Sequence, residues 1–297
     1  RNPQPCEDAP ADADPPDVKR DNKQIQRSDG TSLYITQDLG TAHQRYEDFE
    51  AQKMIYVVAD EQNHHFKVLF ELLKRLKEPY ADGLYHLAYG MVDLPSGKMK
   101  SREGTVVDAD DLMTEVVGEV QANSEERDTL IDLDQEQRAE IMHQVGLAAL
   151  KFLITKVHPK KRMTFDPKES VDLQGQTGPY IQNAYVRIQS VLRKWEGAAN
   201  SQANAYQQLE KEEKDLIQLL FGFPAILQEA AKDYDPSTLA QYAYSLAKSY
   251  HKFYHDHSIL NADTEAARDF RLALSEAVAN SLKFTMKLLG IEMPSRM

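Results

Sequence analysis

The sequence predicts an α/β region followed by an all-α region, judged from where strand and helix patterns occur along its 297 residues. Up to about Leu112, short runs of β-branched and aromatic residues alternate with stretches whose apolar residues recur at helical spacing. Strands and helices in alternation are typical of a parallel sheet covered by helices. Beyond Asp110 the strand patterns stop and helical periodicity continues, which predicts a helical bundle.

The first 27 residues are predicted to form a linker or a loosely held loop. Five of the thirteen prolines fall within the first sixteen residues, with few large apolar side chains among them. Such a segment cannot bury enough apolar surface to offset the conformational entropy lost on folding. We therefore expect an α/β region over residues 28–172 and a helical domain over residues 173–297.

Three strands are expected in the α/β region, over residues 33–36, 54–59 and 84–92. Apolar residues recur at helical spacing between them, over residues 39–49 and 66–76, which predicts two helices. Three strands are few for a sheet with helices on both faces, so the rest of that sheet is expected to lie elsewhere.

A connecting helix is expected over residues 139–157, before the helical domain, and two further helices are expected within that domain, over residues 180–195 and 266–289. The last of them should begin after Asp263 or Thr264, which suit an N-cap, and should stop at Gly290.

The composition excludes several classes of protein. The single cysteine, Cys6, excludes an internal disulfide and a cysteine-rich zinc site. The sequence has no run of about 18 apolar residues that could span a membrane and no apolar stretch typical of a secretory signal. We therefore expect a cytoplasmic protein with no membrane partner.

The formal charge of −12 argues against a surface covered with cations that bind nucleic acid nonspecifically. A local basic track is nevertheless present, formed by Lys151, Lys156, Lys160, Lys161, Arg162 and Lys168. This track has two interpretations, a site for RNA phosphates or an ordinary solvated face.

A first polar segment, residues 28–49, places Tyr34 and Asp38 around the end of the first predicted strand. Ligands bind at the carboxyl ends of strands in open parallel sheets, so these two residues are candidates for substrate contact. The alternative is that Asp38 only caps the helix that follows.

A second polar segment, residues 59–66, contains a dense polar cluster directly after an apolar strand, formed by Asp60, Glu61, Gln62, His64 and His65. A helix N-terminus at this point would present free amide donors to a ligand. We do not expect a metal here, because adjacent histidines point in different directions on a helix.

A third segment, residues 89–112, is a lysine-rich loop bracketed by Gly97 and Gly104. Cations on a flexible loop suit pyrophosphate, whose negative charge must be stabilised when a phosphorus centre is attacked. An exposed turn is the alternative interpretation.

A fourth segment, residues 171–185, combines glycines, side-chain amides and the aromatic residues Tyr180 and Tyr185. These groups can stack on bases and hydrogen-bond to RNA. The alternative is a glycine-rich loop that leads into a core helix.

Taken together and in this order, the four segments resemble the class I aminoacyl-tRNA synthetases, specifically the arginyl-tRNA synthetases. The loop GKMKSREG resembles the second class I signature, Lys-Met-Ser-Lys-Ser, with Lys100 and Ser101 in swapped order. The arginine enzymes are known for degenerate versions of this loop. The segments DGTSLYITQDLGTA and VDLQGQTGPYIQNAY are more specific, and the resemblance covers nearly everything from Ser28 to Met297.

The resemblance implies the second half of a Rossmann-type catalytic domain followed by an anticodon-binding bundle. The other class I signature, His-x-Gly-His, does not occur in this sequence. We therefore expect the N-terminal half of the enzyme, and the domain that reads the tRNA elbow, to be missing from this chain. Such a chain should be inactive alone.

The resemblance also implies the reaction: arginine attacks the α-phosphate of ATP and is then transferred to the terminal ribose of its tRNA. ATP with Mg²⁺ would be a co-substrate, with no tightly bound cofactor and no protein metal site. Arginine contacts would be Tyr34, Asp38 and Gln62. ATP contacts would be Asp60, His64, Tyr89, Gly90, Met91, Lys98, Met99, Lys100 and Ser101. Contacts to the tRNA for arginine would be Asp172, Gln174, Gly175, Gln176, Thr177, Gly178, Tyr180, Asn183, Tyr185 and Met297.

Two other functions remain open. The first is a tRNA-binding module or paralogue fragment that performs no chemistry. The second is the cysteine enzyme of the same class, against which the lack of a zinc-type cysteine cluster counts. A metal at His251, His255 and His257 is a further possibility, although histidines on a bundle helix are more often core or solvated residues.

Overall fold

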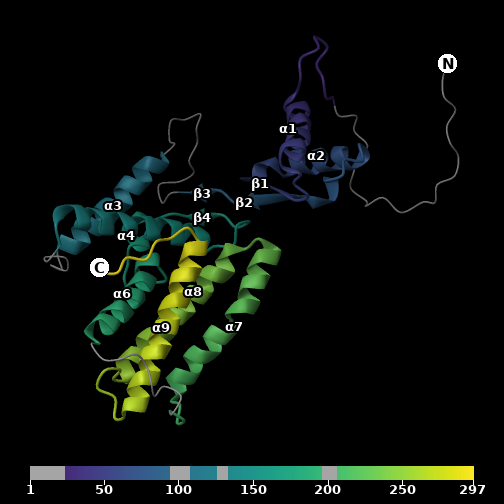
Figure 1. Cartoon of the computed structure of the whole chain (residues 1–297). Helices are drawn as coiled ribbons and strands as arrows, with labels where there is room; N and C mark the ends of the chain where they lie inside the picture. Colours follow the sequence, from purple (N-terminus) through teal and green to yellow (C-terminus); the bar gives the residue numbers. More distant parts are fainter. Residues whose placement is uncertain (1–23, 94–107, 126–132, 196–205) are drawn as a thin grey trace. The chain divides into compact units, whose positions relative to one another are not determined.

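The computed structural model describes residues 24–93, 108–125, 133–195 and 206–297 (Figure 1). The predicted phosphate loop, with Lys98, Met99, Lys100 and Ser101, lies outside the described residues, as do most residues of the predicted linker. The chain forms two compact units. The first comprises residues up to Ile55 together with His64–Tyr85, and the second comprises Tyr56–Asn63 and His86–Met297.

The first unit is built around helices α1 (Tyr34–Phe49) and α2 (Asn63–Arg75). The strand predicted over residues 33–36 is wrong, because Leu33 is the N-cap of α1 and the helix starts at the next residue. Ile35 and Ala42 are the buried residues of α1, so the helical period already starts inside the β-branched run. Such a short apolar run cannot be assigned to strand or helix from its composition.

The strand predicted over residues 54–59 is confirmed as β1 (Met54–Ala59), which is followed by the short 3-10 helix η1 (Asp60–Gln62). The strand predicted over residues 84–92 is two strands, β2 (Leu84–Tyr89) and β3 (Val92–Asp93), the first of them preceded by η2 (Ala81–Gly83). β1 pairs with β2, and β3 pairs in parallel with β4 (Met163–Thr164).

The second unit contains most of the helices. The predicted bundle helices are confirmed as α4 (Gln135–Thr155), α6 (Gly178–Lys194) and α9 (Glu265–Leu288). Four helices were not predicted from the sequence: α3 (Ala109–Glu125), α5 (Pro167–Ser170), α7 (Lys211–Asp233) and α8 (Pro236–Asp256). Figure 1 shows α7, α8 and α9 running alongside one another, and each of these three helices packs on the other two.

Side-chain caps fix the helix starts. The carboxylates of Asp134 and Asp235 accept backbone N–H groups at the starts of α4 and α8, and Thr264 does the same for α9, as predicted. Gly290 adopts a left-handed φ of 70°, and the N–H of Ile291 reaches back to the carbonyl of Met286. This is the Schellman arrangement that ends many helices, so the predicted stop at Gly290 is confirmed.

Two apolar cores stabilise the second unit. The larger lies among α4, α6, α7, α8 and α9 and includes the fully buried Phe152, Ile181 and Leu246. The smaller lies around α3 and α4, where Val116, Phe165 and their neighbours pack against Met297. None of the helices in the part of the chain that the structure describes is long and apolar enough to cross a lipid bilayer.

Candidate functional site

The predicted arginine contacts Tyr34 and Asp38 both lie on α1, not at the end of a strand. Tyr34 is the first residue of the helix and is 79% exposed. Asp38 lies one turn further along, so the interpretation of Asp38 as the helix cap is wrong. One turn of helix places two residues on one face, which is compatible with a shared ligand.

His65 on α2 contacts Asp38 directly. Its Nε2 donates a hydrogen bond of 2.6 Å to Oδ2 of Asp38, and the side chains are 24% and 42% exposed. Among the described residues, Oδ1 of Asp38 accepts no hydrogen bond. One carboxylate oxygen is therefore fixed by the protein while the other is available to a ligand.

Of the two histidines in the polar cluster, only His64 was predicted to contact a ligand, whereas the histidine that contacts Asp38 is His65. His64 is exposed, whereas the ring of His65 meets Phe66 edge-on at 5.4 Å. A usable signal was present: His65 precedes the buried Leu69 by four residues and so lies on the apolar face of α2.

Asp60 and Gln62 occupy η1, directly after β1. Gln62 is exposed, but Oδ1 of Asp60 is buried and has no hydrogen-bond partner among the described residues. Leaving a buried acceptor unsatisfied costs roughly 1–3 kcal/mol. A ligand hydroxyl at this position would remove that cost.

Gly90, between β2 and β3, lies against the α4–β4 connection. Its N–H donates a 2.7 Å hydrogen bond to the carbonyl of Pro159, and a side-chain carbon at this position would overlap the carbonyl of Lys161. Only glycine therefore fits here. The adjacent Tyr89 is 43% exposed and Met91 accepts the N–H of Met163, so the predicted adenine contacts are held on a fixed backbone.

The predicted tRNA loop folds around Asp172 and is tied to the bundle. Oδ1 of Asp172 accepts the N–H of Gln174 at 2.8 Å, and its carbonyl accepts the Thr177 hydroxyl. Gln176 is held at both ends, because its carbonyl accepts Lys156 Nζ at 3.0 Å and its amide donates to Gln241 on α8 at 2.9 Å. Burial lowers the pKa of Lys156, an effect that the nearby Glu169 opposes.

Tyr180 lies in an aromatic cluster between α6 and α8. Its ring is 5.4 Å from that of Tyr244 and 4.8 Å from that of His251, which also contacts Arg187 at 3.1 Å. Burial, together with the Arg187 charge, lowers the pKa of His251 to about 4. The imidazole is therefore neutral near pH 7, as expected for a packed histidine.

Several predicted tRNA contacts have buried side chains or serve the fold. Thr177 caps α6 by accepting the N–H of Tyr180, and Gly178 packs against the backbone of Ala148. Tyr185 is 6% exposed and belongs to the larger core. Exposed or half-exposed side chains remain at Asp172, Gln174, Gln176, Tyr180 and Asn183.

A cavity of about 190 Å³ opens beside α4 and is lined by residues that include Glu140, Lys151 and Glu292. No predicted site residue lines it. Among the described residues, no group of three or more metal-ligating side chains comes together.

Comparisons with known proteins agree with this architecture. Residues 19–166 match the family described as "tRNA synthetases class I (R), catalytic domain", and residues 181–297 match the "DALR anticodon binding domain". The arginine–tRNA ligase of Bacteroides thetaiotaomicron is 53% identical over 283 residues, covering 93% of this chain and 47% of that protein. The Porphyromonas gingivalis enzyme is 48% identical over 280 residues, with 93% and 47% covered. The solved arginyl-tRNA synthetase of Thermus thermophilus matches with a TM-score of 0.79 and 28% identity, covering 92% of this chain and 50% of its own.

A class I catalytic domain joined to a helical anticodon-binding domain defines an aminoacyl-tRNA synthetase of class I, which confirms the predicted fold class. Within that class, the chain belongs to the arginyl-tRNA synthetase family. The chain spans about half the length of the curated relatives that it matches.

Proposed function

We propose that this chain contributes the second half of the active site and the tRNA-binding bundle of an arginine–tRNA ligase. The observation that supports this proposal is the arrangement of the Asp38 carboxylate, whose Oδ2 is hydrogen-bonded to His65 while Oδ1 is available to a ligand. A guanidinium group carries a planar fork of donors that matches a carboxylate, so an oriented carboxylate selects arginine over lysine.

In this proposal, Tyr34, Asp38 and Gln62 bind the arginine side chain and His65 positions Asp38. The hydrogen bond from Nε2 fixes the rotation of the carboxylate before substrate arrives, which lowers the ordering cost on binding. His65 acts through Asp38 and touches no substrate atom, so it is a positioning residue.

ATP is the second substrate, brought in as its magnesium complex. Asp60, His64, Tyr89, Gly90 and Met91 form the nucleoside side of the site. The orphaned Oδ1 of Asp60 would accept a nucleoside hydroxyl there. Lys98, Met99, Lys100 and Ser101, outside the described residues, would attend the phosphates. The remaining half of the site, with the other class I signature, would come from outside these 297 residues.

The tRNA for arginine would contact the segment from Asp172 to Tyr180 and the bundle beyond it. Lys156 and Gln241 hold Gln176, in the middle of this segment, from two sides. An ordered loop next to half-exposed aromatic rings suits a folded RNA, since little ordering cost remains to be met on binding. A cytoplasmic location follows from this role in translation.

The test is arginine-dependent exchange between ATP and pyrophosphate, measured with tRNA present on the product of the full-length gene. Asp38→Asn removes the charge and half of the bidentate geometry, so the arginine KM should rise roughly 100- to 1000-fold. The ATP KM should change far less. An unchanged arginine KM would remove Asp38 from the site, and a wild-type enzyme without exchange would remove the proposed activity.

The role of His65 has its own matched pair of variants. Glutamine can place an amide N–H near the position of Nε2, so His65→Gln should retain most of the arginine affinity. His65→Leu, of similar size without a donor, should raise the arginine KM about tenfold and leave the ATP KM unchanged. Equal effects of the two variants would reduce His65 to a packing role.

A further inference from the structure

The connection from α4 to β4 carries three adjacent cations, Lys160, Lys161 and Arg162, and all three are exposed. They belong to a segment, residues 151–168, that holds six Lys and Arg residues and one acidic residue, Asp166. The whole protein has a formal charge of −12, so this segment is a local exception. We refer to residues 158–162 as the basic turn.

The backbone of the basic turn is fixed. The N–H of Lys161 donates to the carbonyl of His158 at 2.9 Å, which closes a turn with Pro159 at its second position. The carbonyl of Pro159 then accepts Gly90 N–H at 2.7 Å. Because both ends of the turn are held, the three cations project from a defined surface next to Gly90.

Other lysines of the same segment are used by the fold. Nζ of Lys156 binds the carbonyl of Gln176, and Nζ of Lys151 binds the carbonyl of Gly290 at 2.7 Å. The structure therefore divides the basic track into lysines that satisfy backbone carbonyls and cations that do not. Only the second group is available to an external anion.

No carboxylate in the described residues pairs with Lys160, Lys161 or Arg162. The nearest acidic residues along the β3–β4 pair have other neighbours: Asp93 lies opposite Thr164, and Asp166 accepts the N–H of Lys168. Three adjacent like charges repel one another, and in an acidic protein this repulsion could have been relieved by nearby carboxylates. An arrangement that keeps them unpaired suits an anionic partner.

We propose that the basic turn binds the phosphate backbone of tRNA. Successive phosphodiesters carry one charge each, which three fixed cations can match, and the Arg162 guanidinium can bind one phosphate with two hydrogen bonds. The inference rests on the proposed function for the identity of the RNA. It adds a site outside the segment from Asp172 to Tyr180, adjacent in the fold to the predicted adenine contacts.

The test is the salt dependence of RNA binding, measured by titrating a labelled tRNA transcript for arginine with the 297-residue chain. Each phosphate contact contributes roughly 0.7 to 0.9 to the slope of log affinity against log salt. Replacing Lys160, Lys161 and Arg162 together by glutamine should reduce that slope by about 2 to 3 and weaken binding at least tenfold at low salt. The three side chains are exposed, so the urea midpoint of the variant should equal that of the wild type.

The matched control replaces Lys67, Lys74 and Lys77, in and just after α2, by glutamine, because these three are also exposed, carry the same total charge and lie outside the bundle proposed to contact tRNA. This control should leave the slope within about 0.5 of the wild type.

If both triple variants lower the slope equally, or neither does, the basic turn is not an RNA site. If polyglutamate of matched charge binds the wild type as tightly as the transcript does, the turn is a general anion site and the assignment to RNA is overturned. A normal arginine KM in the full-length triple variant, with weakened tRNA binding, would separate this inference from the proposed function.

Discussion

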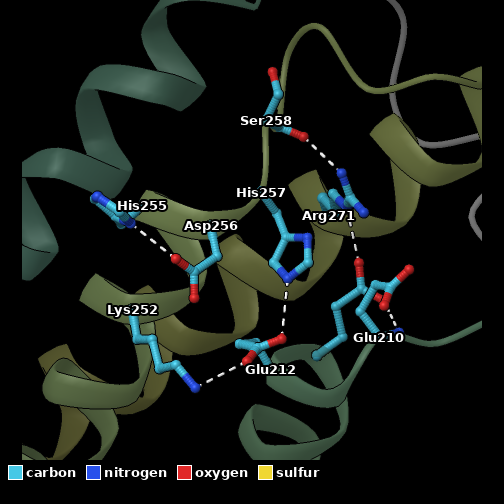
Figure 2. A network of polar contacts seen from close by, with 9 residues as sticks. Glu210, Glu212, Lys252, His255, Asp256, His257, Ser258 and Arg271 are labelled. Atoms are coloured by element: carbon cyan, nitrogen blue, oxygen red, sulfur yellow. Dashed lines mark hydrogen bonds and ion pairs between the residues drawn. The ribbon is translucent and has the colours of Figure 1, made fainter.

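The ion pair between Glu213 and Arg271 provides the sharpest test of how the bundle is held together. Glu213, in the first turn of α7, is fully buried and accepts Nε of Arg271 at 2.8 Å, while the Arg271 side chain is 11% exposed. Arg271 also donates to the carbonyl of Ser258, between α8 and α9, and Glu213 accepts the N–H of Glu210. Figure 2 shows Arg271 beside Ser258 and Glu210 in this network.

Replacing Glu213 with Gln removes the charge and leaves the guanidinium of Arg271 nearly buried without a counter-ion. Breaking a buried pair in this way costs about 3–5 kcal/mol. A smaller cost of about 2–3 kcal/mol, at or just below that range, is expected here, because glutamine still offers a carbonyl oxygen and Arg271 keeps its bond to Ser258. With a urea slope of about 2 kcal/mol per M, the unfolding midpoint should fall by about 1 to 1.5 M.

The assay is urea unfolding followed by tryptophan fluorescence. Trp195 is the only tryptophan in the chain, packs against the larger core and lies 4.4 Å below the Arg268 guanidinium, so it reports on the bundle. Glu276→Gln, an exposed carboxylate on α9, is the control and should not move the midpoint. Replacing both Glu213 and Arg271 by leucine should restore most of the stability. A Glu213→Gln midpoint equal to the wild type would refute the reasoning.

Three other features of the bundle, at Gly178, His251 and Tyr180, can be tested separately. Gly178→Ala should destabilise the protein by about 1–3 kcal/mol, because the new side-chain carbon would overlap the backbone of Ala148. The control Gly222→Ala, in open space on α7, should stabilise the protein by up to about 1 kcal/mol, and thermal unfolding measures both effects. The pKa of His251 is about 4 in the folded protein and 6.5 in an ordinary histidine, so the unfolded state takes up the proton first as the pH falls. The free energy of unfolding should therefore decrease between pH 6.5 and pH 4. If a His251→Gln variant kept the same pH dependence, that dependence would not come from His251. Tyr180→Ala should weaken tRNA binding about tenfold and Tyr180→Phe much less, and equal affinities in a titration would remove Tyr180 from the interface.

Helices with long apolar stripes could be predicted from the sequence. The helices over residues 139–157, 180–195 and 266–289 were found because one buried face repeats for several turns, and that repeat is a local property of the chain. The cap at Thr264 and the stop at Gly290 are equally local. The resemblance that identified the family rests on segments of this same kind, in which neighbouring residues carry the signal.

Prediction from the sequence was wrong where a short apolar run is compatible with both a strand and a helix. Residues 33–36 are β-branched and aromatic, and only their packing into the first unit shows that they begin a helix. Helix α7 was not predicted either, although Glu210 and Glu213 form a capping box at its start. Its exposed Phe221 and internal Pro224 blur the apolar period on which such predictions depend.

Only the tertiary structure decided which polar residues are available for function. The pairing of Asp38 with His65, the use of Lys156 and Lys151 to hold backbone carbonyls, and the contact between Gly90 and Pro159 all join positions far apart in the sequence. A lysine in a basic track looks the same in the sequence whether it satisfies a buried carbonyl or faces solvent. The difference depends on the path of the chain, because a hydrogen bond forms only where folding brings a donor within about 3 Å of its acceptor.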